Sequence, residues 1–298
     1  MASTKAIRKT NGERLFDTFN IVLLLGLVLI TLYPLLYVLF ASFSEPSELV
    51  RFRGLLFKPL GWSTAAYKAV FLNPNILTGY RNTLFYMVMG TTLNMVLTCL
   101  GAYALSRRNV LFKLPITLFI LFTLFFNGGL IPTYLLVART LSWIDTPWAV
   151  IVPTAISTWN LLVLKTAFEQ VPQALEEAAR IDGANDFTIL WRIVIPLSLP
   201  AIAVIVLFYA VAHWNAYFSA LIYLRDRGLY PLQLILREIL IANQTGDMTT
   251  GTLGGDVEPI AETIKYATIV VATVPILFLY PFLQRYFVKG VLIGAVKE

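Results

Sequence analysis

The sequence has 298 residues, of which 58% are hydrophobic and only 13% are charged. A water-soluble globular protein is roughly half apolar and about a quarter charged, so these proportions exclude that class and place the chain in a lipid bilayer. The net charge of +6 does not require a nucleic-acid partner, because membrane proteins concentrate Lys and Arg in their cytoplasmic loops.

Six apolar runs are long enough to cross a bilayer, which takes about 20 residues for roughly 30 Å of hydrocarbon. They predict an all-α membrane protein with six transmembrane helices. No cleavable signal peptide is expected, because the first run is too long and is not followed by an A-x-A site. In chain order the runs occupy residues 19–43, 83–105, 114–138, 148–168, 193–224 and 266–287.

The predicted domain organisation follows from these runs. Residues 1–18 form an N-terminal segment, residues 19–287 the six-span domain and residues 288–298 a C-terminal tail. An even number of spans puts both termini on one side of the membrane. With the termini in the cytoplasm, 13 of the 23 Lys and Arg residues are cytoplasmic and several lie close to span ends, as the positive-inside rule requires. We therefore expect both termini in the cytoplasm.

The segment at residues 169–192, between the fourth and fifth runs, is amphipathic and is expected to be structured. Residues 173–181 are nearly all good helix formers, and Gly183 is a natural stop after them. Asn185 or Asp186 then caps a second short helix. The sequence therefore predicts a helix–turn–helix that lies across the cytoplasmic face.

The first of these two helices carries small and acidic side chains next to one another. Ala178 and Ala179 have short side chains, so another protein could approach this helix closely. Glu176 and Glu177 offer carboxylates that could pair with Arg or Lys across an interface. An ordinary interfacial helix with solvated charges would carry the same residues. These residues alone leave both interpretations open.

A longer motif runs through this segment. The letters EEAARIDGAND, from Glu176, are followed by IVIPLSLP from Ile193. They match the EAA loop of binding-protein-dependent ABC importer permeases, and the whole resembles the carbohydrate branch of that family, near the smaller maltose-permease subunit. The resemblance covers most of the chain beyond about Thr83. Three further stretches carry it: FNGGLIPTYLLV from Phe126, FYAVAHWNAYFSAL from Phe208 and RYFVKGVLIGAVKE from Arg285.

The resemblance implies a type I ABC importer permease fold in which the first helix of the loop is a coupling helix that lies in a cleft of an ATPase subunit. The tail is expected to reach between two ATPase subunits, and the polar external loop at residues 242–258 to enter the cleft of an external solute-binding protein. On this chain the coupling residues are Glu176, Glu177, Ala178, Ala179, Asp182, Gly183 and Pro196, and the tail residues are Gly290, Gly294 and Lys297.

The partners implied by the resemblance are a second permease subunit from a different chain, two ATP-binding-cassette ATPase subunits and the solute-binding protein, in a bacterial inner membrane. ATP and Mg belong to the ATPase, and the chain has no catalytic site of its own. The nearest approach to a phosphate-binding loop, Gly246-x-x-x-x-Gly251-Thr252, lacks the required Lys. The single histidine, His213, has no second His or Cys ligand, so a structural hydrogen bond is the expected role.

Other classes remain as alternatives. An ion-coupled secondary transporter would keep carboxylates in its spans, and the six runs contain no Asp or Glu. A membrane-embedded enzyme would need a cluster of His, Asp or Glu near one interface. Within the importer class, an amino-acid or peptide importer is the nearest rival, and carbohydrate is favoured by resemblance.

Polar and aromatic residues within the spans are candidates for lining the substrate pathway, because amides and aromatic rings suit sugar hydroxyls and ring faces. Each of them could instead bond a neighbouring helix or anchor at the interface. The candidates are Asn94, Asn127, Trp159, Asn160, Trp214, Asn215 and Tyr217.

Overall fold

The computed structural model describes residues 10–241 and 260–278, which divide into two compact units. The first unit contains residues 1–72 and 245–271 and the second contains residues 73–244 and 272–298. The described helices of the first unit are α1 (Asn11–Ser42), α2 (Pro46–Arg51) and α3 (Ala65–Leu72), together with most of the helix Ile260–Phe278.

Helix α1 begins at a capping box in which the Thr10 hydroxyl oxygen accepts from the Glu13 backbone N–H and the Glu13 carboxylate accepts from the Thr10 N–H. Beyond its first turns it is apolar on all sides, and most of its residues are exposed within this chain. A helix of that kind is stable only against lipid or a partner. The loop after it is held by a hydrogen bond from the Leu60 N–H to the Ser44 hydroxyl, 3.0 Å long.

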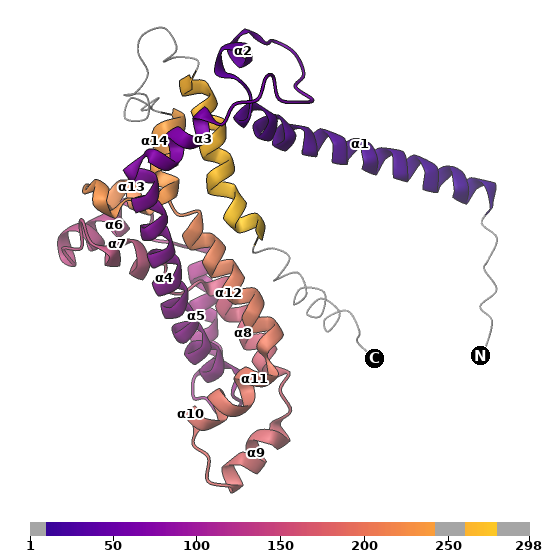
Figure 1. Cartoon of the computed structure of the whole chain (residues 1–298). Coiled ribbons are helices and arrows are strands. Elements are labelled where there is room, and N and C mark those ends of the chain that lie inside the picture. Colours follow the sequence, from indigo (N-terminus) through magenta and orange to yellow (C-terminus); the bar gives the residue numbers. More distant parts are fainter. Residues whose placement is uncertain (1–9, 242–259, 279–298) are drawn as a thin grey trace. The chain divides into compact units, whose positions relative to one another are not determined.

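The second unit is a bundle in which α4 packs along α8 and α12 (Figure 1). Its core contains buried side chains from all three helices, among them Ala102, Leu164 and Ile205. Cys99 is buried in the same core. The helices of this unit are α4 (Pro74–Ser106), α5 (Lys113–Phe125), α6 (Leu130–Leu135), a π-helix (Leu136–Thr140), α7 (Pro147–Ile151), a 3₁₀ turn (Val152–Thr154), α8 (Thr158–Glu169), α9 (Gln173–Ile181), α10 (Asp186–Ile189), a second π-helix (Leu190–Val194), α11 (Ile195–Leu197), α12 (Leu199–Trp214), α13 (Phe218–Tyr223), a 3₁₀ turn (Arg227–Leu229) and α14 (Leu232–Ile241).

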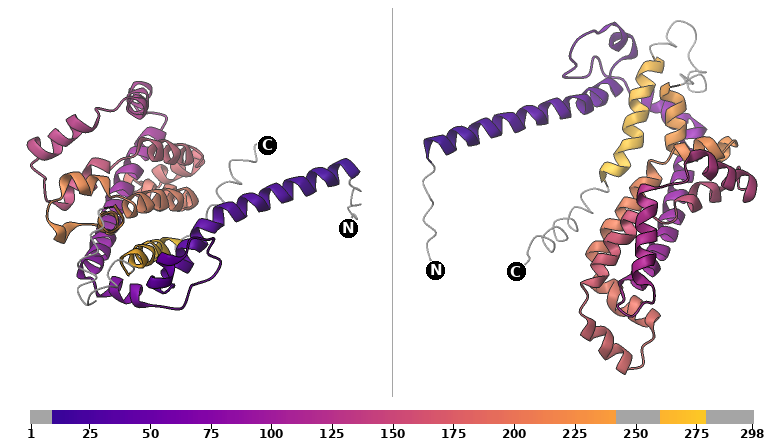
Figure 2. Two further views of the ribbon diagram at one scale, coloured as in Figure 1. Left: turned by 90° about the horizontal axis from the view of Figure 1, so that it is seen from above. Right: turned by 180° about the vertical axis from the view of Figure 1, so that it is seen from behind.

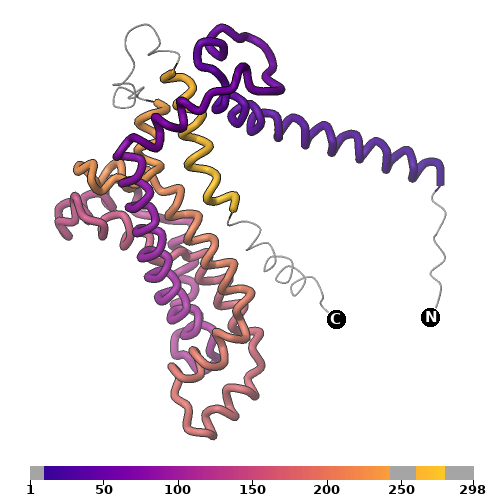
Figure 3. Tube along the Cα trace, viewed as in Figure 1, coloured from indigo at the N-terminus to yellow at the C-terminus, as the bar shows by residue number. Residues whose placement is uncertain are grey.

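The chain leaves the bundle after α8, forms α9 and α10 beyond the end of α4, and returns through α11 into α12 (Figures 2 and 3). This excursion corresponds to the predicted helix–turn–helix at residues 169–192. We call the part of the bundle next to it the α9 end.

The predicted spans correspond to helices, but three of them are broken. In the described part of the chain, α1, α4 and the helix Ile260–Phe278 are each long and apolar enough to cross a membrane alone. The other three predicted runs correspond to bent helix pairs, with bends of 105° between α5 and α6, 50° between α7 and α8, and 88° between the α10–α11 stretch and α12. The number of spans reaches six only when each bent pair counts as one, so six remains a prediction.

Candidate functional site

Helix α9 has the boundaries that the sequence predicts, Gln173 to Ile181. The chain turns after it at Gly183, whose φ of +83° is in the left-handed region that glycine enters at low cost. Asn185 then caps α10, because its side-chain oxygen accepts from the Thr188 N–H at 2.8 Å. The predicted helix–turn–helix is confirmed.

The EAA motif residues are divided between two faces of α9. Glu176 and Ala179, three residues apart, face the chain's own bundle: Glu176 is only 7% exposed and Ala179 packs against the core. Glu177 and Ala178 are exposed, and Ile181 is 87% exposed. The 3.6-residue helical period produces this division. The exposed face of α9, formed by Glu177, Ala178 and Ile181, is therefore the part of the motif that another protein can reach.

Of the last two predicted coupling residues, Asp182 lies in the turn between α9 and α10 and Pro196 lies after α10. Asp182 is exposed and ends α9, with its N–H donating to the Ala178 carbonyl at 3.1 Å. Pro196 lies in α11, just before the 88° bend that leads into α12. A proline has no N–H to donate and commonly accompanies such a change of direction.

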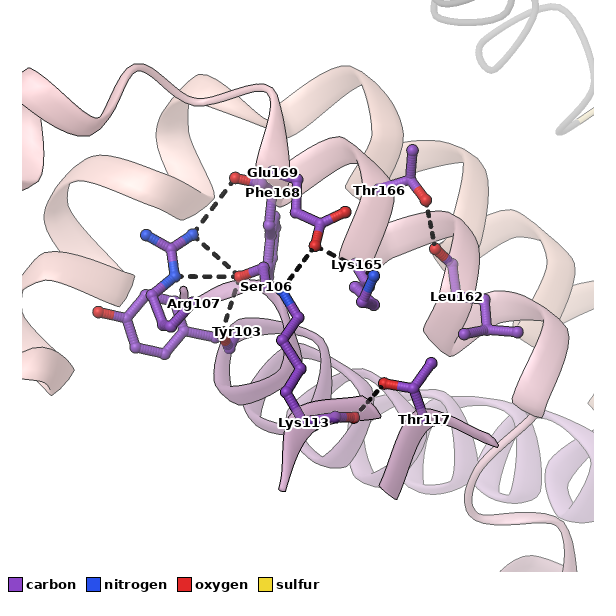
Figure 4. Close-up of polar contacts among 10 residues, drawn as sticks. All are labelled: Tyr103, Ser106, Arg107, Lys113, Thr117, Leu162, Lys165, Thr166, Phe168 and Glu169. Atoms are coloured by element: carbon purple, nitrogen blue, oxygen red, sulfur yellow. Dashed lines mark hydrogen bonds and ion pairs between the residues drawn. The ribbon is translucent and has the colours of Figure 1, made fainter. Parts of the chain in front are cut away.

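Glu176 forms an ion pair with Arg107, the residue that follows the last turn of α4. The Arg107 guanidinium also donates to the Ser106 hydroxyl at 2.9 Å and to the Phe168 carbonyl at 3.3 Å (Figure 4). Its central carbon lies 4.7 Å from the centre of the Tyr103 ring. Burial lowers the pKa of Arg107 from its usual value, although an arginine stays protonated at neutral pH.

A second polar cluster lies beside the first at the α9 end. The Glu169 carboxylate accepts from Lys113 and from Lys165, each at 3.0 Å (Figure 4). These contacts join the start of α5 to the end of α8. They do not involve α9.

A cavity of about 210 Å³ lies between α8, α12 and α13. The Asn160 side chain lines it, is only 6% exposed and has no hydrogen-bond partner in the described part of the chain. The remaining lining is mostly hydroxyl, imidazole and aromatic, and carries no carboxylate or ammonium group. The principal lining residues besides Asn160 are Thr154, Ser157, Phe208, Tyr209, His213 and Ser219.

Asn94, predicted as a pathway residue, is fully buried and bonded within the chain. Its amide N–H groups donate to the carbonyls of Thr154 and Ala155 at 2.6 and 2.8 Å, and its oxygen lies 2.7 Å from His213 Nε2. The carbonyls belong to the break between α7 and α8, where the helix does not supply partners. Asn94 therefore holds the broken helix together, and His213 makes the structural hydrogen bond that was expected.

Of the seven predicted pathway residues, only Asn160 lines the cavity. Trp214 is buried outside the cavity lining, and its Nε1 has no partner among residues 10–241 and 260–278. Four of the seven are exposed on the described surface: Asn127, Trp159, Asn215 and Tyr217.

The sequence analysis missed most of the cavity lining. Tyr209 and His213 lie four residues apart on one face of α12, a spacing that could have identified them together. Ser157, the N-cap of α8, follows Pro153 in an otherwise apolar run, which signals a break. The predicted tail residues and the external loop at residues 242–258 lie outside the described part of the chain.

Comparisons with known proteins agree with one another. The family model described as "Binding-protein-dependent transport system inner membrane component" matches residues 83–293. The chain is 44% identical over 287 residues to the polygalacturonan/rhamnogalacturonan transport system permease protein YtcP of Bacillus subtilis (strain 168), covering 96% of this chain and 99% of that protein. It is 41% identical over 297 residues to the protein LplC of the same organism, with 100% of both chains covered.

A solved structure is similar along nearly the whole chain. It is a crystal structure of "a bacterial ABC transporter involved in the import of the acidic polysaccharide alginate". One of its chains is 32% identical to this one and superposes with a TM-score of 0.87, covering 95% of this chain and 100% of that chain.

Proposed function

Because the chain belongs to the family of binding-protein-dependent transport system inner membrane components, we propose that it is the permease subunit of an ABC importer that moves an oligosaccharide inward. It is a multi-pass membrane protein and supplies a passage rather than a catalytic site. Relatives that match nearly its whole length include a polygalacturonan/rhamnogalacturonan permease and a chain of an alginate importer. These names favour carbohydrate over amino acids or peptides.

The exposed face of α9 is the observation that carries the coupling role. It presents Glu177 to a basic partner, and Ala178 permits close approach. Ile181, which is 87% exposed, offers an apolar contact that water alone does not favour. The partner that we propose for this face of α9 is the ATPase subunit of the importer.

Two such ATPase subunits would bind ATP and Mg and close on each other. Closure would displace α9 and shift the bundle between inward-facing and outward-facing states, which makes α9 the element that both nucleotide and substrate influence. We further propose that the tail residues Gly290, Gly294 and Lys297 contact these subunits and that both termini are cytoplasmic. A second permease subunit and an external solute-binding protein complete the assembly.

The cavity beside Asn160 supports a direct contact with the transported sugar. The Asn160 side-chain amide has no hydrogen-bond partner among the described residues and opens into the cavity, so water or a ligand hydroxyl can bind it there. Phe208 in the same lining offers an apolar face for a sugar ring. A cavity of about 210 Å³ fits one ring rather than a whole oligosaccharide.

The deciding experiment is affinity purification of the chain from native membranes in a mild detergent, followed by mass spectrometry. Recovery of an ATPase subunit, a second permease and a solute-binding protein is the expected result. Recovery of the chain alone, in a detergent that preserves a known importer complex, would contradict the proposal. Uptake that collapses with an ionophore but persists without ATP would point instead to an ion-coupled carrier.

Asn160→Ala tests the sugar contact, with Asn215→Ala as its matched control because Asn215 is an exposed amide outside the cavity lining. Both variants should bind the ATPase subunits normally. Only Asn160→Ala should lower the rate of ATP-dependent sugar uptake. Equal rates for the two variants would remove Asn160 from the pathway.

A further inference from the structure

Three segments of the second unit meet at the last turn of α4. Arg107 contacts the end of α8 through the Phe168 carbonyl and contacts α9 through the Glu176 carboxylate. One turn earlier, the Tyr103 hydroxyl lies 3.4 Å from a carboxylate oxygen of Asp186 in α10. No other ion pair among the described residues connects α9 to the bundle, because Arg180 pairs with Asp186 inside the helix–turn–helix itself.

From this geometry we propose that Arg107 is the positioning residue that transmits a displacement of α9 to the membrane bundle. The proposal rests on the importer function above, since the ATPase supplies the displacement. Arg107 connects α9 to the bundle, and Glu176 is the residue of α9 that it contacts. The ATPase binds the exposed face of α9, and the buried face of α9 transmits the displacement to Arg107.

The chemistry of the contact explains why it would move as a unit. A guanidinium has five donors in a rigid planar fork, so Arg107 can bind Ser106, Phe168 and Glu176 together, which an ammonium group cannot do with the same geometry. Both members of the pair are largely buried: their side chains are 15% and 9% exposed. Separating them would strand two charges away from water, which costs far more than moving them together.

The contact with Phe168 connects Arg107 to a second helix, α8. The Phe168 carbonyl, in the last turn of α8, also accepts from the Val171 N–H at 3.3 Å, and a cation at a helix C-terminus is favoured by the helix dipole. A displacement of Arg107 therefore acts on the ends of α4 and α8 at once. Both helices lead directly to Asn94 and to the cavity beside Asn160.

A purely structural ion pair is the competing explanation, and a double variant separates the two. Arg107→Met alone leaves Glu176 buried without its partner, so its effects mix folding with coupling. Arg107→Met combined with Glu176→Leu removes both charges, which restores a buried apolar contact. Arg107→Lys keeps the positive charge but loses the planar, multiply donating guanidinium group. Arg108→Met is the matched control, because Arg108 is the adjacent exposed arginine.

The measurement is hydrogen exchange of the purified complex with its ATPase subunits, with and without MgATP plus vanadate. In the wild type and in Arg108→Met, nucleotide should change the exchange of α9 and also of the ends of α4 and α8. In the double variant and in Arg107→Lys, the change in α9 should persist while the change at α4 and α8 falls at least about fivefold.

Three results would overturn the proposal. One is a wild-type response at α4 and α8 in both Arg107 variants. Another is loss of the α9 response in them, which would place Arg107 at the ATPase contact rather than after it. The third is the absence of any ATPase subunit from the wild-type complex, which would reject the importer function as well.

Discussion

Replacing Asn94 with alanine should weaken the bundle by breaking three contacts at one buried position. The side chain is fully buried, donates to the carbonyls of Thr154 and Ala155, and pairs with His213 Nε2. Alanine leaves two carbonyls and an imidazole nitrogen without this partner. At about 0.6–1.5 kcal/mol for each of the three hydrogen bonds, the free energy of unfolding should fall by about 1.8–4.5 kcal/mol.

The assay is reversible unfolding of the purified chain in detergent by titration with a denaturing surfactant, with thermal unfolding as a second probe. Asn215→Ala is the control, since its amide makes one exposed bond to the Val211 carbonyl and its loss should cost less than about 0.5 kcal/mol. A double-mutant cycle with His213→Ala should show that the two substitutions are less than additive, by about 1 kcal/mol. A loss below about 1 kcal/mol for Asn94→Ala, or full additivity in the cycle, would refute the reasoning.

Substitutions at three other positions test separate features. In Gly90→Ala the new Cβ would clash with the His213 ring, so the unfolding midpoint should fall by an amount equivalent to about 1–3 kcal/mol. An unchanged midpoint would contradict the packing. A Cβ placed on Gly183 would meet nothing within 4 Å, so Gly183→Val should act only through the positive φ at this position, at a local cost of about 1–2 kcal/mol. We expect Gly183→Val to lower ATP-dependent uptake without loss of membrane insertion. Gly183→Asn should retain more uptake, because asparagine tolerates a positive φ better. Hydrogen bonds from the backbone N–H groups of Arg225 and Asp226 hold the pKa of Asp145 below its ordinary value. The ionised carboxylate therefore stabilises the fold above about pH 4, and this stabilisation is lost as the pH falls through the lower pKa of the folded state. Asp145→Asn should therefore flatten the acid side of the stability–pH curve measured by thermal unfolding, and a curve that matches the wild type would remove this role.

The first helix of the helix–turn–helix could be predicted to the residue, and the cap of the second to one of two residues, because the signals are local. Residues 173–181 favour helix, Gly183 accepts a positive φ and Asn185 caps the next helix through its own side chain. None of these needs a distant contact. The family motif that begins at Glu176 then gave the expected function, and the match to residues 83–293 bears it out.

The faces of α9 could not be assigned from the same signals. Glu176 and Glu177 are adjacent and chemically identical, and the sequence analysis treated both as carboxylates for a partner. Which of the two faces the bundle is decided by how α9 packs, with Ala179 against the core and Glu176 paired with Arg107 at the end of α4, while Glu177 remains exposed.

Composition, apolar run length and the EAA motif thus determined the class of protein, its helical content and the helix for which we propose a partner. These are properties of short segments and of the bilayer, which demands that every spanning segment satisfy its own backbone. The tertiary structure alone decided where the spans break, that the buried Asn94 joins a break to His213, and that Asn160 opens into a cavity. Each of these depends on which side chain of another helix lies within hydrogen-bonding distance, and that is fixed only when the helices pack.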